Sequence, residues 1–188
     1  MKKIILTRIK EHQATVRLLV GQATVIEKIA RIFIKSLKNG GKILLCGNGG
    51  SAADAQHVAA ELVGRFKKER RAWPAIALVS NPSTVTAIGN DYGFEYVFLR
   101  QVEALAKKGD VVVGISTSGN SKNVLNAMSE AKKVGCATIG ATGKNGGELA
   151  KIADVCFRAS SDNTPRVQEA HILMWHIVCE LVELKLAK

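Results

Sequence analysis

His57 and Glu61 are an imidazole and a carboxylate placed four residues apart, shortly after a glycine-rich turn. In a helix, side chains at this spacing project from one face, so we predict that the two groups lie side by side. The turn, Cys46-Gly-Asn-Gly-Gly-Ser51, follows an apolar run that is typical of a buried strand. The helical pattern after the turn extends to about Gly64. We therefore expect a ligand site where this strand passes into a helix.

The glycines of this turn favour the binding of an anion. Gly47, Gly49 and Gly50 allow the backbone to turn sharply and a ligand to approach it closely. The free N–H groups and the positive dipole end of the following helix then face that ligand. The turn lacks the Gly-Lys-Ser/Thr ending of a Walker loop and the spacing of a GxGxxG loop. Many such turns only connect elements, so this turn alone leaves both interpretations open.

A second polar turn follows the apolar run of residues 111–115. It reads Ser116-Thr-Ser-Gly-Asn-Ser121 and carries four hydroxyl groups within six residues. Like the first turn, it lies between a predicted strand and a predicted helix. Two such turns suit one phosphorylated ligand, held in a crevice at the carboxyl ends of a parallel sheet.

The elements that must position these groups alternate along the chain. Short apolar runs predict five strands, at residues 42–46, 74–79, 111–115, 136–141 and 154–158. Helical patterns separate them, at residues 51–64, 83–89 with 94–106, 121–134 and 146–152. This alternation is typical of an α/β fold with a parallel sheet. One or two helices are predicted over residues 3–38, and a closing helix from about Pro165 to Leu186. The wide apolar face of the first helices also favours packing between subunits.

Composition narrows the class of protein. The 188 residues suit one domain, and 47% of them are apolar, which is ordinary for a globular protein. No run has the length of a membrane span, and the first residues meet charge too soon for a signal peptide. The four cysteines have no paired spacing, so we expect buried free thiols in a cytoplasmic protein. The formal net charge of +11 fits nucleic acid or anionic sugars equally, but there is no array of aromatic residues for base stacking.

Further polar residues are ambiguous on their own. The closing helix holds Gln168, Glu169, His171 and His176, and the two histidines lie in an apolar context typical of core residues. The segment of residues 88–94 is predicted to be a turn, in which Asn90 and Asp91 could bind sugar hydroxyls. Arg65 and Arg166 could meet a phosphate, but such residues are more often solvated or paired with a carboxylate.

Five motifs occur in order and with compatible spacing over about residues 40–180. They are Cys-Gly-Asn-Gly-Gly-Ser at 46–51, His57-x-x-x-Glu61, Gly-Asn-Asp-Tyr-Gly-Phe at 89–94, Gly-Ile-Ser-Thr-Ser-Gly-Asn-Ser at 114–121, and Arg166-Val-Gln-Glu-x-His171-x-x-x-x-His176. Each is weak alone. Together they resemble the phosphoheptose isomerases, bacterial enzymes built on a sugar-isomerase (SIS) domain.

The resemblance implies a single SIS domain over residues 1–188. Its fold is a flavodoxin-like, doubly wound α/β sheet of five parallel strands, with extra N-terminal helices and a long C-terminal helix. Residues 1–40 would pack on the core and on partner subunits of a homotetramer with active sites at subunit interfaces. The implied reaction interconverts D-sedoheptulose 7-phosphate and D-glycero-D-manno-heptose 7-phosphate, the first committed step towards the heptose of lipopolysaccharide and surface glycans. No nucleic acid or membrane partner is implied.

The resemblance also implies roles for individual residues. The phosphate would be held by Ser116, Thr117, Ser118 and Ser121. Further substrate contacts would come from Asn48, Gly49, Gly50, Ser51, Glu61, Asn90, Asp91 and Gln168. One Zn²⁺ ion would be bound by His57, Glu61, Gln168 and His176. Glu61 and His176 match the family's acid/base pair.

These residue types suit an aldose–ketose isomerisation. The reaction removes a proton next to a carbonyl and returns it to the neighbouring carbon, so it needs a base, an acid and stabilisation of an enediolate. We expect Glu61 to be the base and His176 to protonate or polarise the oxygen, with Lewis-acid help from zinc. Gln168 and His176 are about 12 Å apart along a regular helix, so both reach one metal only if their side chains lean towards each other across two turns or the helix is irregular. Without zinc, these residues could hydrogen-bond the sugar.

Three other functions remain open from the sequence. A non-catalytic SIS module that binds partner proteins, as in a replication-initiation regulator, could dispense with the acid/base pair that this chain keeps. A sugar-phosphate-sensing regulator would usually carry a helix-turn-helix domain, for which 188 residues leave no room. An isomerase of another sugar phosphate, such as a hexulose or arabinose phosphate, would have a similar serine turn.

Overall fold

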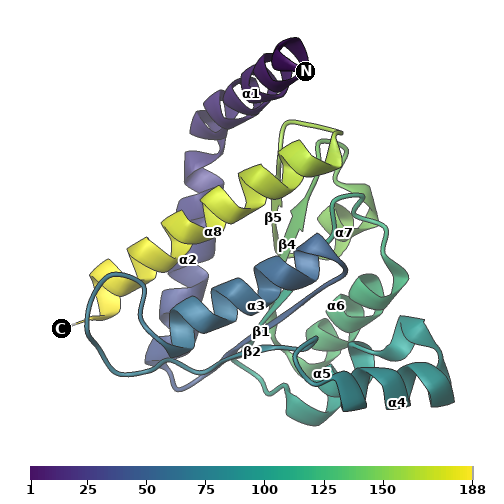
Figure 1. Ribbon diagram of the computed structural model, residues 1–188. Coiled ribbons are helices and arrows are strands. Elements are labelled where there is room, and N and C mark those ends of the chain that lie inside the picture. The colour runs from purple at the N-terminus through teal and green to yellow at the C-terminus, as the bar shows by residue number, and fades with distance from the viewer. Residues whose placement is uncertain (188) are drawn as a thin grey trace.

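A five-stranded, all-parallel sheet forms the centre of the protein in the computed structural model, which describes residues 1–187 (Figure 1). The strand order is β2-β1-β3-β4-β5. The strands are β1 (Ile43–Gly47), β2 (Ala75–Ala77), β3 (Val111–Ile115), β4 (Ala137–Thr142) and β5 (Val155–Arg158). The five apolar runs of the sequence are therefore confirmed as strands. The order matches the doubly wound, flavodoxin-like arrangement that was expected.

Helices connect and flank these strands. They are α1 (Lys2–Arg17), η1 (Leu18–Gln22), α2 (Ala23–Lys38), α3 (Gly50–Val63), α4 (Pro82–Tyr92), η2 (Phe94–Tyr96), α5 (Leu99–Leu105), α6 (Lys122–Val134), α7 (Gly147–Ile152) and α8 (Thr164–Leu186). The helix order agrees with the prediction, including the N-terminal helices and the long closing helix.

One boundary differs from the sequence interpretation. Residues 88–92 were predicted to form a turn, but they are the last part of helix α4. The side chain of Asn81 caps the start of this helix by accepting the N–H of Thr84, and Pro82 occupies its first turn. The helix ends at Gly93, whose φ of 99° is accessible to glycine. The turn residue is thus Gly93, and Asn90 and Asp91 are helical.

Each face of the sheet carries its own apolar core. Side chains alternate along a strand, so Ile43 and Leu45 point to one face and Leu44 and Cys46 to the other. The first face is covered by α2, α3 and α8, and the second by α5, α6 and α7. Strands buried on both faces explain why the apolar runs are continuous and do not alternate with polar residues.

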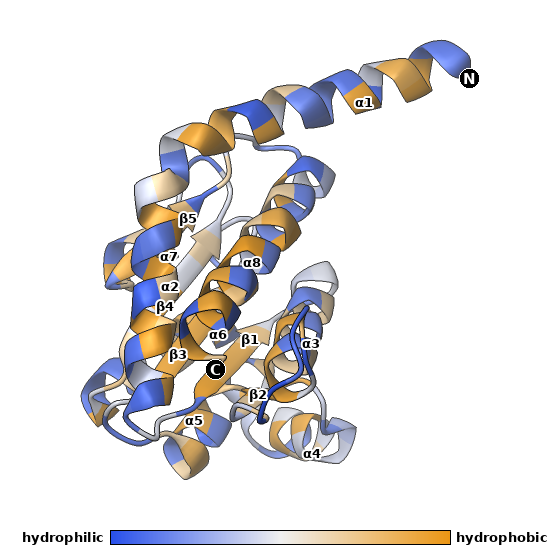
Figure 2. Cartoon of the chain, turned by 90° about the vertical axis from the view of Figure 1, so that its left-hand side faces the viewer, coloured by the Kyte–Doolittle hydropathy of each residue, from blue (hydrophilic) through white to orange (hydrophobic). Residues whose placement is uncertain are grey.

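Helix α1 extends away from the body of the protein (Figure 2). Its side chains Ile4, Ile5 and Ile9 are 63%, 57% and 49% exposed. Ion pairs and hydrogen bonds hold its middle to the start of α8, where His12 lies 2.7 Å from Glu169. Within residues 1–187, no helix has the length and apolar character that a membrane span requires.

The strand order reverses between β1 and β3, which are neighbours in the sheet. Chains that leave these two strands turn to opposite sides and open a crevice at the carboxyl ends of the strands. The glycine-rich turn follows β1 and the serine-rich turn follows β3. The fold therefore brings the two polar turns of the sequence to the same place.

Candidate functional site

A reciprocal pair of amides joins the two turns. The Nδ2 group of Asn48, after β1, donates to Oδ1 of Asn123 at the start of α6. The Nδ2 group of Asn123 donates back to Oδ1 of Asn48, and both distances are 2.9 Å. Asn123 is 3% exposed, so its amide depends on this partner. The sequence analysis did not single out Asn123. Its only sequence signal is a polar residue at a position where the amphipathic helix faces the core.

Hydroxyl groups gather in the second turn, as expected. The Oγ atom of Ser116 lies 2.9 Å from that of Ser121 and 3.4 Å from that of Ser118. Ser116 is buried, whereas Thr117 and Ser121 are half-buried and Ser118 is exposed. The turn leads into α6, whose first N–H groups have no partner within the helix. Hydroxyl donors beside a helix N-terminus are suited to hold a phosphate dianion.

Gly50 makes the closest approach between the first turn and α8. A Cβ atom at position 50 would overlap the amide of Gln168, with Cδ only 2.8 Å away. Gly49 has a φ of 55°, which also favours glycine. Ser51, in the first turn of α3, is 4% exposed. Gln168 therefore lies at the start of α3, next to the glycine turn.

His57, Glu61 and His176 form a cluster farther along the same two helices. The Nε2 atom of His57 lies 2.9 Å from Nε2 of His176 and 3.2 Å from Oε1 of Glu61. The three ligand atoms lie within 4.8 Å of one another. The i, i+4 spacing on α3 brings His57 and Glu61 together, and the packing of α8 beside α3 adds His176 (Figure 1).

This cluster fits a divalent metal such as zinc. Two imidazoles and one carboxylate are a ligand set of catalytic zinc sites, which leave a fourth position open. Bonds of about 2.0–2.1 Å in a tetrahedron place neighbouring ligand atoms about 3.3 Å apart. Two of the three separations, 2.9 and 3.2 Å, are close to that value, and the third lies within 4.8 Å. Gln168 is not part of this cluster. Its amide lies against Gly50, which precedes His57 by about 10 Å along α3.

Asp54 lies on the same face of α3, between Gly50 and His57. Its Oδ2 atom is buried and has no hydrogen-bond partner among residues 1–187. Burial raises the pKa of Asp54 to about 6, although the neighbouring His57 lowers it in part. The sequence analysis did not name this residue. Its position three residues before His57 and seven before Glu61 is the signal that could have found it.

Other predicted residues lie elsewhere. Asn90 and Asp91 are exposed on α4, where Asn90 donates to Asp91 over 2.8 Å. Arg166 pairs with Glu169 and donates to the backbone oxygen of Arg8 over 3.0 Å, so it serves to hold α1. Arg65 is exposed and lies 3.7 Å from Glu69.

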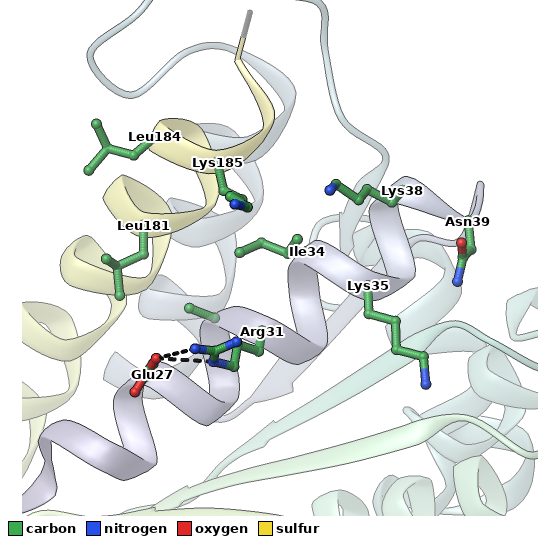
Figure 3. Close-up of a pocket in the computed structure, with 10 residues that line it drawn as sticks. Glu27, Arg31, Ile34, Lys35, Lys38, Asn39, Leu181, Leu184 and Lys185 are labelled. Carbon is green, nitrogen blue, oxygen red and sulfur yellow. Dashed lines mark hydrogen bonds and ion pairs between the residues drawn. The ribbon is translucent and has the colours of Figure 1, made fainter.

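Two pockets differ in what lines them. One of about 520 Å³ lies beside the serine turn and includes Thr117, Ser118 and Asn145. Another of about 590 Å³ lies between α2 and the end of α8, with Ile34 and Leu181 on its walls (Figure 3). The second contains none of the predicted site residues. We therefore expect the ligand to bind in the pocket beside the serine turn, at the carboxyl ends of the strands.

Comparison with known proteins agrees with this description. The family model described as SIS domain matches residues 9–143. The phosphoheptose isomerase of Nitratiruptor sp. is 65% identical over 152 residues, covering 81% of each chain. The phosphoheptose isomerase of Aliarcobacter butzleri is 53% identical over 188 residues, covering 100% of each chain.

Solved structures give the same result. A phosphoheptose isomerase from Francisella tularensis superimposes with a TM-score of 0.92 at 36% identity, covering 98% of this chain and 100% of that one. The likeness therefore extends over the sheet, the N-terminal helices and α8, and includes every element of the candidate site. By sequence and by fold, the chain belongs to the phosphoheptose isomerase family of SIS-domain proteins.

Proposed function

We propose that the protein is an aldose–ketose isomerase that converts D-sedoheptulose 7-phosphate to D-glycero-D-manno-heptose 7-phosphate. The observation that carries the proposal is the cluster of Glu61 and His176 beside His57, where α8 packs against the helix that follows the glycine-rich turn. The relatives named above bear the name of this activity. A protein that only binds a partner has no need of a base and an acid held together in this way.

The two turns would hold the two ends of the substrate. Ser116, Thr117, Ser118 and Ser121 would bind the phosphate through their hydroxyl groups and the start of α6. Asn48, Gly49, Gly50 and Ser51 would contact the sugar from the first turn, with Gln168 opposite them. Asn90 and Asp91 would complete the set. Because both are exposed on α4, we expect them to act where subunits meet.

Glu61 and His176 would carry the proton transfers. The Glu61 carboxylate removes a proton from C1 of the ketose, and the electron pair forms an enediolate between C1 and C2. His176 supplies a proton to the carbonyl oxygen on C2 and then takes back the proton of the hydroxyl on C1, so the imidazole returns to its starting state. The proton returns to C2, and the product is the aldose. No atom is gained or lost in this sequence.

His57, Glu61 and His176 would bind one zinc ion, with Gln168 as the fourth ligand. Bound zinc would supply Lewis-acid stabilisation of negative charge on the sugar oxygens. A carboxylate has two oxygen atoms, so Glu61 can remain a ligand through one and accept a proton through the other. The short separations of His57 from His176 and from Glu61 support this assignment.

We further propose that residues 1–188 form one SIS domain that assembles as a homotetramer. The exposed isoleucines of α1 support a surface that another subunit covers. In this arrangement residues 1–40 pack on the core and on partners, and the active sites lie at subunit interfaces. Light scattering would show the mass of four chains, and replacement of Ile4 and Ile9 by glutamate would lower it.

The setting that fits this activity is the cytoplasm, where sugar phosphates are made. We propose that the product feeds heptose synthesis for lipopolysaccharide or surface glycans. A strain that lacks the gene would then lose heptose from its surface polysaccharide, and a plasmid copy would restore it.

The direct test uses purified protein, sedoheptulose 7-phosphate and NMR in D₂O. We expect the aldose to appear with deuterium at C2, because a carboxylate exchanges its proton with solvent. A chelator should abolish turnover and zinc should restore it. Aldose without deuterium would point to a shielded proton or to a hydride shift instead of the proposed exchange.

Two outcomes would lead to another function. Turnover of a hexulose or arabinose phosphate but not of the heptulose would assign a different sugar phosphate. No turnover by folded, zinc-loaded protein, together with the same result for Glu61→Gln, would favour a module that binds partner proteins.

A further inference from the structure

The loop of residues 64–73, between α3 and β2, curves around the C-terminal end of α8 (Figure 1). It contains the basic run Arg65–Arg71, which in sequence resembles a solvated or anion-binding surface. One of these arginines is internal. The side chain of Arg70 is 3% exposed and lies 3.2 Å from the carboxylate of Glu183 on α8, which is also 3% exposed. This charge therefore has a role inside the protein.

Glu183 fixes the loop to α8 through its backbone. The carboxylate accepts the N–H groups of Phe66, Lys67 and Lys68 over 3.2, 2.8 and 2.9 Å. Burial raises the pKa of Glu183, but the three N–H groups and Arg70 together outweigh it and lower the pKa. The carboxylate thus stays ionised and anchors three consecutive residues.

Arg70 fixes the end of α3. Its guanidinium donates to the backbone oxygens of Glu61, Leu62 and Gly64 over 2.7, 2.9 and 3.1 Å. The last carbonyl groups of a helix have no partner within the helix, and a cation there also interacts favourably with the helix dipole. The guanidinium is stacked 3.6 Å from the ring centroid of Trp73. The position of Glu61 in the cluster is therefore tied to this loop.

Phe66 ties the loop to the opposite member of the cluster. Its ring is stacked on the imidazole of His176, with centroids 5.7 Å apart and 25° between the planes. On another side, His176 meets the ring of His57 edge-on at 5.0 Å. Glu183 holds the backbone N–H of Phe66, which fixes the point from which the ring leaves the loop beside His176.

We propose that the 64–73 loop is a positioning element for the reaction. Arg70 holds the backbone of Glu61, and Phe66 orients the imidazole of His176, so one loop sets the distance and angle between base and acid. Phe66 acts through His176 and does not itself touch the substrate. The proposal rests on the proposed isomerase function. It also accounts for the buried Arg70–Glu183 pair, because such pairs add little stability but can fix register.

The test compares three variants of the full chain. Phe66→Leu keeps an apolar side chain but removes the flat ring, and Phe66→Tyr keeps the ring. Phe157→Leu is the matched control, because Phe157 contacts the other histidine of α8, the core residue His171, with centroids 5.9 Å apart. For each variant we would measure kcat, KM, thermal stability and zinc affinity by competition with a chelator.

We expect Phe66→Leu to lower kcat about tenfold or more, because small misplacements of catalytic groups are costly. KM should change less than threefold, and Phe66→Tyr should retain kcat within twofold. Zinc affinity of Phe66→Leu should fall about tenfold, as when support around a ligand is lost. Phe157→Leu should lower thermal stability and leave kcat and zinc affinity near those of the wild type.

Unchanged kcat and zinc affinity in Phe66→Leu would overturn the proposal. So would losses that only follow thermal stability, as in Phe157→Leu. Failure of the proposed function is a separate result, because the wild type would then be inactive. Zinc affinity would still report whether Phe66 orients His176.

Discussion

Helix α8 presents two histidines, five residues apart, to two different environments. His171 is fully buried beside β4, where its Nε2 group donates to the backbone oxygen of Thr142 over 3.0 Å. His176 faces α3, where its Nε2 atom meets that of His57 over 2.9 Å. Burial lowers the pKa of His171 to about 4, although the bond to Thr142 raises it in part. The first histidine stabilises the core, and the second belongs to the candidate site.

The two residues look alike in sequence because both have apolar neighbours. Five residues in a helix correspond to a rotation of about 140°, so they point to different sides. The side with His171 also carries Trp175 and Val178 and packs on the sheet. The side with His176 also carries Glu183 and faces α3 and its loop. What lies opposite a residue therefore decides its role, and variants on each side should have different consequences.

The largest effect on turnover is expected at Glu61, the carboxylate on α3 that faces His176. Glu61→Gln keeps the size of the side chain but removes the base, so kcat should fall about 10²- to 10⁴-fold. Thermal stability should change by only a few degrees, since Glu61 is not part of the core. Turnover measured in saturating zinc would test this, and a loss smaller than tenfold would contradict the assignment of the base.

Glu183→Gln should cost stability although Glu183 lies on the same side as His176. Arg70 would be left buried without its full counter-charge. We expect this to lower the free energy of unfolding by about 3–5 kcal/mol and the thermal midpoint by roughly 10 °C. Glu180→Gln is the control, because the pair of Glu180 with Lys67 is 43% and 58% exposed. That change should cost less than about 1 kcal/mol.

The pH dependence of the Glu183 variant sharpens this prediction. The pKa of Glu183 is lowered from 4.5 in the folded protein, so its ionised form stabilises the fold above that pH. This contribution is lost as the pH falls through the lowered value. Chemical unfolding at pH 7 and below 4 should therefore show the variant approaching the wild type at acid pH. An equal difference at both pH values would contradict the ion-pair explanation.

On the sheet side, His171→Leu should affect stability and leave turnover per folded molecule within twofold. The backbone oxygen of Thr142 would lose its hydrogen-bond donor, which should lower the free energy of unfolding by about 1–3 kcal/mol near pH 7. In the wild type the neutral imidazole is favoured on folding, so stability falls as the pH drops from 6.5 towards 4, by up to about 3 kcal/mol. The variant lacks this loss, so the gap should narrow at pH 4.5. A tenfold loss of kcat would place His171 in the site and contradict the different roles given to the two histidines.

The smallest effect is expected at Asp54, on the α3 side of the crevice. Its pKa is raised from 3.8 to about 6, so ionisation opposes folding; the cost is absent below pH 4 and complete above about pH 6. In metal-free protein, Asp54→Asn should raise stability by roughly 1 kcal/mol at pH 8, allowing for screening by water. It should raise stability less at pH 4. Destabilisation at pH 8 would mean that the carboxylate has a partner in the assembled protein.

Much of the fold could be predicted from the sequence because it depends on local patterns. Continuous apolar runs predicted strands buried on both faces, and their alternation with helical patterns predicted the parallel sheet. The end of α4 was misplaced because Gly89 and Gly93 both resemble helix stops, and only the positive φ of Gly93 distinguishes them.

Part of the candidate site could also be predicted from the spacing of residues that are close in sequence. His57 and Glu61 were placed together by the i, i+4 rule, and the serine turn by its hydroxyl groups. The contribution of His176, 119 residues beyond His57, depends on how α8 packs against α3 and came only through the family resemblance. Asn123 was missed because its partner Asn48 lies 75 residues away, and the internal role of Arg70 because its counter-charge Glu183 lies 113 residues away. Whether Gln168 joins the metal ligands stays a prediction.

The reciprocal amide pair of Asn48 and Asn123 has a consequence for how this site can change over evolutionary time. The two positions are separated by 75 residues, yet each amide satisfies the other. Replacing Asn48 leaves the buried Asn123 with unmet hydrogen bonds, and replacing Asn123 leaves the half-buried Asn48 without its partner, so single changes at either position are disfavoured. Related sequences should therefore exchange the two residues together. A search for new substrate range that randomises one position at a time would sample mostly defective pairs, whereas a library that varies both at once would reach the functional alternatives.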